Sequence, residues 1–380
     1  MKVVIAIDSF KGSLETLESG GAVAEGIKAV FPDAETVICP LADGGEGTVR
    51  AVTAALGGEL CQVEVTGPLG ESVIAEYGII SSERLAVLEM SAAAGITLVP
   101  EEKRNPLYTT TRGVGEMILD AISKGCRKFI IGIGGSATND GGVGMLKALG
   151  FEFLDERGEP IADGAIGLSA LSRIVTDKAI REFSNCEIRV ACDVSNPLCG
   201  DRGCSRIYGP QKGADEKMIA DMDGWLSHYA SLTRELLPEA DADFPGVGAA
   251  GGLGFALKYY LGASLGSGIG LVMDAIRLEE HIIDADIVIT GEGRLDSQSA
   301  MGKAPVGVAR LAKKHGKRVI AFAGAVSDGA EVCNKEGIDA FFPIVRRPCT
   351  LGEAMDKENA YKNLKNTAEQ VFRLLKTGLN

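Results

Sequence analysis

The sequence has little positive charge and no long apolar run, and these two absences exclude several classes of protein. With 39 Lys and Arg against 52 Asp and Glu, the net charge is −13, whereas surfaces that bind nucleic acid or anionic membranes carry basic patches. No apolar stretch reaches the ~18 residues of a membrane-spanning helix, and the apolar run near the first residue is too short for a signal peptide. We therefore expect a cytoplasmic protein without nucleic-acid or membrane partners.

Zinc and hydrolase chemistry are also disfavoured. The nine cysteines contain no C-x-x-C pair, and the three histidines lie far in the sequence from Cys199 and Cys204, so no zinc site is expected. No histidine follows an expected strand, where the general base of a Ser-His-Asp hydrolase would be needed. The cysteines are expected to be reduced thiols, most of them packed in the interior.

Glycine, in contrast, is abundant and clusters in loops: the chain has 50 glycines, well above the ~7% of an average protein. The densest loop, residues 134–142, separates an apolar run at 129–133, expected to be a buried strand, from an expected helix at 143–149. Glycines let a ligand approach the backbone, and the N–H groups of such a loop can bind phosphate. A tight capped turn is the alternative, but several similar loops in the chain favour an anionic small-molecule site.

Strand and helix patterns alternate at both ends of the chain. Apolar β-branched runs at 3–7 and 36–39 flank a helical pattern, and strands at 287–290, 318–323 and 340–344 restore the same rhythm near the end. This alternation predicts parallel strands in an α/β sheet.

The middle of the chain has a different pattern. Residues 73–80 and 85–90 alternate or run apolar, as short antiparallel strands do. We therefore expect two α/β domains. Residues 1–67 plus 285–380, from both chain ends, are expected to form one parallel-sheet domain, and residues 68–284 an inserted mixed α/β domain.

Charged side chains follow several of the expected strands. In parallel sheets ligands bind beyond the carboxyl ends of the strands, so these side chains are candidates for a site. Phosphoryl transfer uses backbone donors and cations to hold phosphates, a carboxylate to hold Mg²⁺ and another to accept a proton. The residues alone therefore indicate a phosphate-handling α/β enzyme. The groups are Asp8 with Lys11, Asp43 with Glu46, Asn139 with Asp140, Asp193, and Arg294 with Asp296.

Two other classes of function are considered. The absence of G-x-x-x-x-G-K-[ST] excludes a Walker-type loop, but Gly132-x-Gly134-x-x-Ala137 fits a loose dinucleotide fingerprint and suggests a nicotinamide-dependent hydroxy-acid oxidoreductase. Against it, no acidic residue ends a clear second strand ~20 residues later. A non-enzymatic organic-acid-binding regulator is the other alternative, and the lack of a basic helix-turn-helix disfavours it.

Four motifs resemble those of the bacterial type-1 glycerate kinase family, in the same order. They are DSFKGS at 8–13, LADGGEGT at 41–48, GIGGSATNDGG at 132–142 and TGEGRLD at 290–296. The resemblance implies ATP-dependent phosphorylation of D-glycerate, with Mg²⁺, in organic-acid or glyoxylate catabolism, and 2-phosphoglycerate is the favoured product. It also implies a Rossmann-like domain, an inserted domain and an active-site cleft between them.

The resemblance and the chemistry together suggest a role for each candidate residue. Asp193 or Asp296 is the expected base, and Arg294 and Lys11 are expected to contact the glycerate carboxylate or the transferred phosphate. Asp8, Ser9 and Arg294 are expected to bind the substrate, and Asp43, Glu46 or Asp140 to hold Mg²⁺. The expected nucleotide-phosphate contacts are Gly134, Gly135, Ser136, Thr138, Asn139, Gly141 and Gly142. The expected partners are the small molecules ATP and D-glycerate, and the expected assembly is a monomer or homodimer.

Overall fold

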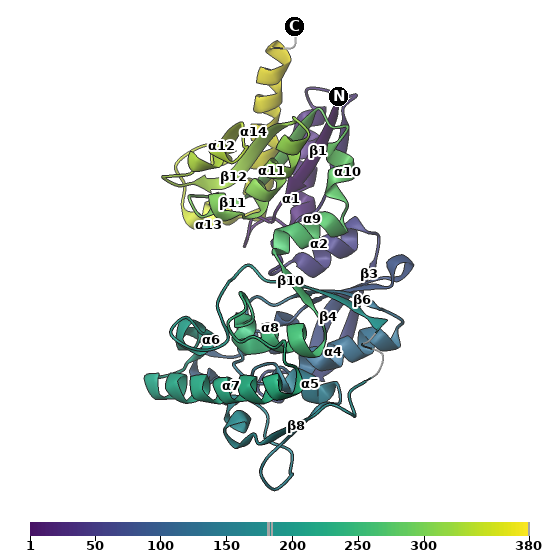
Figure 1. Ribbon diagram of the computed structural model, residues 1–380. Coiled ribbons are helices and arrows are strands. Elements are labelled where there is room, and N and C mark those ends of the chain that lie inside the picture. The colour runs from purple at the N-terminus through teal and green to yellow at the C-terminus, as the bar shows by residue number, and fades with distance from the viewer. Residues whose placement is uncertain (181–182, 184, 379–380) are drawn as a thin grey trace. The chain divides into compact units, whose positions relative to one another are not determined.

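The computed structural model describes residues 1–378 except 181, 182 and 184, and the chain forms two compact units (Figure 1). The first unit contains residues 1–43, 54–56 and 269–380, and the second contains residues 44–53 and 57–268. One unit has a parallel sheet built from both chain ends and the other a mixed sheet built from the middle, so the predicted α/β fold class is confirmed.

The sheet of the first unit has five parallel strands in the order β13-β12-β11-β1-β2. The strands are β1 (Lys2–Ile7), β2 (Glu35–Ile38), β11 (Ile287–Leu295), β12 (Arg318–Val326) and β13 (Ala340–Pro343). Both faces of β1 are buried, because a strand inside a parallel sheet is covered by helices on each side. The chain runs from β1 outward to β2, and from β11 outward to β12 and β13. The strand order therefore reverses between β1 and β11.

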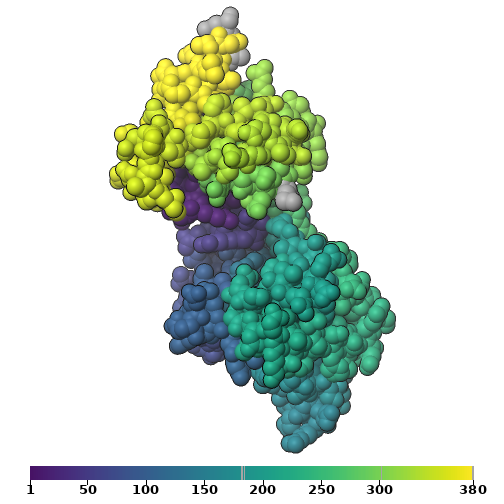
Figure 2. Space-filling view, turned by 90° about the vertical axis from the view of Figure 1, so that its left-hand side faces the viewer, coloured from purple at the N-terminus to yellow at the C-terminus, as the bar shows by residue number. Residues whose placement is uncertain are grey.

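Helices from distant parts of the sequence pack together in this unit. An added Cβ on Gly26 of α1 would lie 2.4 Å from the carbonyl oxygen of Lys365 in α14, so glycine permits this close contact. In Figure 2 the purple N-terminal residues lie against the yellow-green C-terminal ones of the same unit. The helices are α1 (Thr16–Lys28), α9 (Gly268–Ala275), α10 (Leu278–Ile282), α11 (Ala304–Lys314), α12 (Val332–Lys335), α13 (Leu351–Met355) and α14 (Lys357–Thr377).

The sheet of the second unit is mixed, with the strand order β10-β9-β6-β5-β4-β3. Strands β3, β4 and β5 pair antiparallel, as the alternating pattern predicts, and β5, β6, β9 and β10 pair parallel. The strands are β3 (Glu59–Thr66), β4 (Ser72–Ile80), β5 (Leu85–Glu89), β6 (Lys128–Gly132), β9 (Glu187–Ala191) and β10 (Ser264–Gly266), with a separate pair β7 (Glu152–Leu154) and β8 (Arg173–Val175).

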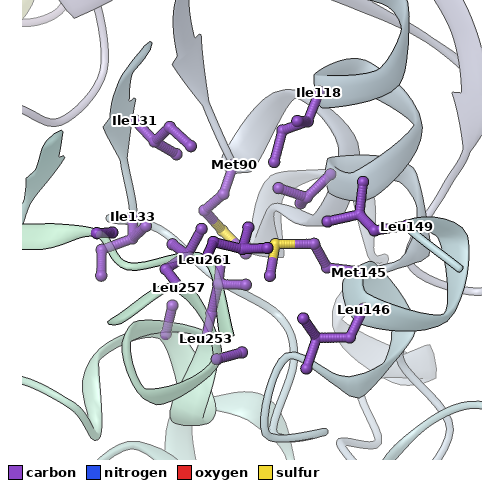
Figure 3. Packing of buried hydrophobic residues seen from close by; sticks show 14 of the residues in the cluster. Met90, Ile118, Ile131, Ile133, Met145, Leu146, Leu149, Leu253, Leu257 and Leu261 are labelled. Atoms are coloured by element: carbon purple, nitrogen blue, oxygen red, sulfur yellow. The ribbon is translucent and has the colours of Figure 1, made fainter. Parts of the chain in front are cut away.

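The helices of the second unit pack around this sheet and against one another. Their bounds are α2 (Thr48–Ala55), α3 (Ser91–Ala94), α4 (Arg112–Ser123), α5 (Val143–Ala148), α6 (Cys204–Tyr208), α7 (Glu216–Leu236) and α8 (Ala249–Tyr260). Figure 3 shows Ile131 of β6, Ile118 of α4, Met145 of α5 and Leu253 of α8 converging in one cluster. This core supports the loop that follows β6.

The positions at which the chain passes from one unit to the other differ from the expected domain boundaries at 67 and 285. Strand β3 pairs with β4 from Glu59↔Ile79 to Thr66↔Ser72, so residues 59–66 belong to the sheet of the second unit. Residues 269–284, expected in the inserted domain, fall in the first unit. A hairpin cannot be divided between two sheets without losing its hydrogen bonds, which is why the first changeover precedes β3.

Candidate functional site

In the first unit, three carboxylates stand at the carboxyl ends of neighbouring strands. Asp8 directly follows β1, Asp43 follows β2, and Glu292 lies in β11 one residue after Gly291, which pairs with Ile7. The order of the sheet reverses between β1 and β11, and in open α/β sheets ligands bind beyond the strand ends at such a reversal. The fold therefore brings the predicted residues of this unit to the edge where a ligand is expected.

The carboxyl group of Asp8 is poised to exchange a proton near neutral pH. Asp8 is only 5% exposed, and the backbone N–H of Ser9 donates to its Oδ1 at 2.7 Å. Burial and then the negative charge of Asp43 raise the pKa of Asp8 to about 7, against the opposing effects of the Ser9 hydrogen bond and Lys11. The nearby charge of Glu292 raises it further. A proton acceptor with a pKa near the working pH is the kind that catalysis uses.

Two cations belong to the same strand-end region. Lys11 Nζ donates to Asp43 Oδ2 at 3.4 Å, and Arg294 Nε in β11 donates to Ser327 Oγ at 3.0 Å. Burial lowers the pKa of Lys11, but the charges of Asp43 and Asp8 more than offset this and hold it above the ordinary value. Lys11 is thus cationic at neutral pH, and the exposed Arg294 guanidinium has further N–H groups to offer an anion.

Asp296 is held as an anion by the turn that it begins. Its Oδ1 accepts hydrogen bonds from the backbone N–H of Gln298 at 2.9 Å and of Ser299 at 3.0 Å, and Lys303 Nζ lies 3.9 Å away. Burial raises the pKa of Asp296, but these donors and Lys303 bring it below the ordinary value. Asp296 is therefore a weaker base than Asp8. The hydroxyl of Ser299 also donates to Glu292, which sequence reasoning did not select although Glu292 stands inside the fourth motif.

In the second unit, the loop 134–142 follows β6 as predicted and leads into α5. Gly134 and Gly135 are exposed, whereas Ser136, Thr138 and Asn139 are buried. Gly135 has φ +72°, a left-handed conformation that favours glycine. Only Gly134 and Gly135 of this loop are thus exposed. The other predicted phosphate-binding residues are buried and stabilise the conformation of the loop.

Hydrogen bonds tie the buried part of the loop to three other segments. Asn139 Nδ2 donates to Ser205 Oγ at 2.8 Å, and Thr109 Oγ1 donates to the carbonyl oxygen of Ala137 at 2.9 Å. The N–H of Gly141 donates to the carbonyl oxygen of Gly251 at 2.9 Å. Gly251 belongs to a second glycine-rich segment that backs the first one.

Asp140 supports the structure of the loop. Its carboxylate accepts four hydrogen bonds, from the backbone N–H groups of Gly142, Gly144 and Thr111 and from the Thr111 hydroxyl. Burial raises the pKa of Asp140, and these donors oppose the rise. Three of these hydrogen bonds reach Oδ2 and one reaches Oδ1, so Oδ1 keeps an acceptor position and Asp140 stays a predicted Mg²⁺ ligand.

The glycine-rich turn of the second motif, residues 41–48, leads into α2. A carboxylate of the protein itself, that of Glu89, lies at the N-terminus of this helix. Glu89 Oε1 accepts from the N–H of Val49 at 2.9 Å, and the N–H groups of Gly47 and Thr48 also contact this carboxylate. A carboxylate at a helix N-terminus occupies the position that a phosphate would otherwise take. Sequence reasoning missed Glu89, whose only signal is its place at the end of an apolar strand. Glu46 in the same turn is exposed.

Asp193 lies at the carboxyl end of β9, as predicted. It is exposed, and its Oδ1 accepts from the N–H of Gly268 at 3.0 Å. Asp193, Glu46 and the loop 134–142 belong to the second unit, whereas Asp8, Ser9, Lys11, Asp43, Arg294 and Asp296 belong to the first.

The described residues hold no group of three or more metal-binding side chains. Mg²⁺ is commonly bound by one or two carboxylates together with phosphate oxygens, so Asp43 and Glu46 have suitable chemistry without such a group. No helix within the described residues is long and apolar enough to cross a membrane.

The dinucleotide fingerprint is not supported by the geometry around it. Strand β6 ends at Gly132 and α5 begins at Val143, so the glycines of the fingerprint do not open a helix as that motif requires. Parallel strands that end in carboxylates, together with glycine-rich loops, are instead those of an α/β enzyme that handles phosphate.

Comparison with known proteins narrows this class to one family. The glycerate kinase family model matches residues 3–376. The chain is 50% identical over 379 residues to the glycerate 2-kinase of Escherichia coli (strain K12), covering 100% of this chain and 99% of that protein. It is 46% identical over 376 residues to the glycerate kinase of Bacillus subtilis (strain 168), covering 99% and 98%. The chain therefore belongs to the glycerate kinase family.

A solved structure from Salmonella typhimurium LT2 is similar along the whole chain. Its TM-score is 0.93 at 48% sequence identity, and the match covers 100% of this chain and 99% of that one. The resemblance drawn from four motifs is thus confirmed over the full length.

Proposed function

We propose that this glycerate kinase transfers the γ-phosphoryl group of ATP to the C2 hydroxyl of D-glycerate and releases ADP and 2-phosphoglycerate. The observation that carries the proposal is the strand-end group of the first unit, in which the buried Asp8 lies near Lys11 and in the same sheet as Arg294. A proton acceptor and cations are what an alcohol and an anionic substrate need in this reaction. The C2 position is supported by the name of the Escherichia coli relative.

Each candidate residue is assigned a role in substrate binding or in proton transfer. Arg294 and Lys11 bind the glycerate carboxylate or the transferred phosphate, since Arg can bind either in a bidentate manner. The hydroxyl oxygen attacks the γ-phosphorus, the bond to the ADP oxygen breaks, and the hydroxyl proton passes to a carboxylate. Asp193 and Asp296 are the bases proposed from the sequence, and the raised pKa of Asp8 adds a third candidate with a better-matched proton affinity.

The nucleotide is assigned to the loop of the second unit. Gly134 and Gly135 offer exposed backbone to the phosphates, and Ser136, Thr138, Asn139, Gly141 and Gly142 fix the shape of the loop. Mg²⁺ would neutralise charge on the phosphates, and Asp43, Glu46 or Asp140 would hold it. Because ATP is the donor, we place the reaction in the cytoplasm. The monomeric or homodimeric state stays a prediction.

Phosphorus NMR of the purified protein with ATP, Mg²⁺ and D-glycerate tests the activity and the position together. The expected result is ADP and a new phosphomonoester signal split into a doublet by the single proton on C2. A triplet would assign the phosphate to the CH₂ group at C3 and overturn the C2 proposal. Intact ATP without a phosphomonoester would overturn the D-glycerate assignment, and L-glycerate serves as the matched control.

A further inference from the structure

Lys212 is a buried cation that the proposed reaction does not yet use. It is 2% exposed, and it ends the short 3₁₀ helix Pro210–Lys212 between α6 and α7. The described part of the chain buries only two other charged side chains, Asp8 and Asp140. A buried ammonium group is costly unless its donors are used, so its partners show what it stabilises.

Both hydrogen-bond partners of Lys212 Nζ belong to the loop 134–142. Its Nζ donates to Ser136 Oγ at 2.8 Å and to the carbonyl oxygen of Thr138 at 2.5 Å. Within the described residues Lys212 forms no ion pair with a carboxylate, so its charge is not cancelled by a direct contact. The ammonium therefore fixes the loop through one hydroxyl and one backbone carbonyl.

The same loop is held from the other end by the opposite charge. The Asp140 carboxylate accepts its four hydrogen bonds from both sides of the turn, including Gly142 and Thr111. The loop is thus clamped between a buried cation at Ser136–Thr138 and a buried anion at Asp140. The only exposed part of the loop, Gly134 and Gly135, directly precedes the segment that the cation holds.

The ammonium group also gives the loop a positive charge over the working pH range. Burial lowers the pKa of Lys212 to about 8, and the negative charge of Asp140 acts in the opposite direction. Lys212 is therefore mostly protonated at neutral pH. A cation behind backbone N–H groups favours an anion in front of them, and low dielectric strengthens the effect.

We propose that Lys212 is a positioning residue for the nucleotide phosphates, which holds Ser136 and Thr138 so that the backbone at Gly134 and Gly135 meets the phosphate of ATP. The proposal rests on the proposed role of the loop 134–142 in binding ATP. Lys212 acts through the loop and does not itself contact the substrate.

The test compares Lys212→Met with Lys212→Arg and with Lys147→Met as a matched control. Lys147 is also a largely buried lysine of this unit; its Nζ donates to the carbonyl oxygen of Ile161 and pairs with Asp163, both outside 134–142. The measurements are kcat, the KM values for ATP and glycerate, the Kd of ADP by calorimetry and the thermal midpoint. For Lys212→Met we expect KM for ATP and Kd of ADP to rise about tenfold or more, with KM for glycerate within about twofold.

Loss of a lysine with a purely structural role would raise the KM values for ATP and glycerate alike. A rise confined to ATP and ADP therefore identifies Lys212 as a positioning residue for the nucleotide. Lys212→Arg is expected to recover part of the ADP affinity, because it keeps the charge, and Lys147→Met is expected to leave both KM values unchanged. Equal losses for ATP and glycerate, or an unchanged Kd of ADP in folded Lys212→Met, would overturn the proposal. If Lys212→Met does not fold, Ser136→Ala, which removes one partner of Lys212, takes its place with the same expected split.

Failure of this inference can be told apart from failure of the proposed loop function. Gly134→Val narrows the exposed part of the loop without touching Lys212. If Gly134→Val weakens ADP binding and Lys212→Met does not, only the role of Lys212 falls. If neither variant changes ADP binding, the loop is not the nucleotide site and both proposals fall.

Discussion

Asp8 and Gly291 join the two strands between which the order of the first sheet reverses: the backbone N–H of Asp8 donates to the carbonyl oxygen of Gly291 at 3.0 Å. This bond fixes the Asp8 backbone at the carboxyl end of β1, next to Glu292. The position of the Asp8 carboxyl is therefore set by the sheet itself rather than by a mobile loop.

Replacing Asp8 by Asn should test its role as proton acceptor. The substitution keeps the volume and removes the ability to take a proton, so kcat is expected to fall ~10²–10⁴-fold. Steady-state kinetics with ATP and D-glycerate measures the change. Asp33→Asn, which alters an exposed carboxylate of the same unit, is the control and should retain full activity. A kcat within about threefold of the wild type would return the base role to Asp193 or Asp296.

The same variant should change how stability depends on pH. The pKa of Asp8 is about 7 in the folded protein against an ordinary 3.8, so the folded state holds the proton more tightly than the unfolded chain. This contribution to stability is complete below about pH 4 and is lost as the pH rises through 7. Asn carries no charge, so Asp8→Asn should be more stable than the wild type near pH 8, by up to roughly 4 kcal/mol. Urea unfolding from about pH 4 to 8 measures the difference, and a constant difference would contradict it.

Arg294→Met should raise the KM for glycerate about 10- to 100-fold if the guanidinium binds the substrate carboxylate, because charged hydrogen bonds contribute ~1.5–3 kcal/mol. Arg346, an exposed arginine of the same unit, provides the control variant Arg346→Met. A lower kcat with an unchanged KM would instead assign Arg294 to the transferred phosphate, since the contact would then form only in the transition state.

Gly134→Val should raise the KM for ATP about tenfold with little loss of stability. An added Cβ at Gly134 meets nothing closer than Gly45 Cα at 3.8 Å, so the fold has room for a Cβ at this exposed position. Kinetics at saturating glycerate and a thermal midpoint separate these effects. Gly224→Ala, at an exposed position of α7 where nothing lies within 4 Å and φ is not positive, controls for the loss of a glycine. An unchanged KM would argue against phosphate binding at this loop.

Glu89→Ala should lower the free energy of unfolding by about 1–2 kcal/mol, because three backbone N–H groups at the start of α2 lose their acceptor. Glu89→Gln keeps an acceptor oxygen and should lose about half as much. Chemical denaturation of both variants measures the loss. Equal stability of Glu89→Ala and the wild type would show that water replaces the carboxylate at no cost.

The sequence was informative wherever structure depends on neighbouring residues. The buried strands, the antiparallel middle strands and the loop 134–142 follow from apolar patterns and glycine clusters, and these predictions are confirmed. The contacts of Lys212 were out of reach, because its partner Ser136 is 76 positions away and only the fold brings them together. The hydrogen bonds of Asp140 were out of reach for the same reason: they include one from Thr111, which precedes it by 29 positions.

The first changeover between the units shows another limit. Strand β3 alternates between exposed and half-buried residues, so its sequence does not reveal which sheet it joins. Its partner β4 decides the matter through long-range pairing, which no local pattern encodes.

The pairing of β1 with β11 has a consequence for synthesis of the chain. Val3 pairs with Ile287, so β1 leaves the ribosome long before its neighbour β11 exists, whereas the sheet of the second unit is complete once Gly266 has been made. Pairing over such a separation closes slowly, and domains fold as units during translation. We therefore expect the second unit to complete its sheet first, while β1 has only β2 as a partner and its other edge stays open. The first sheet can be completed only after β11, β12 and β13 have been made.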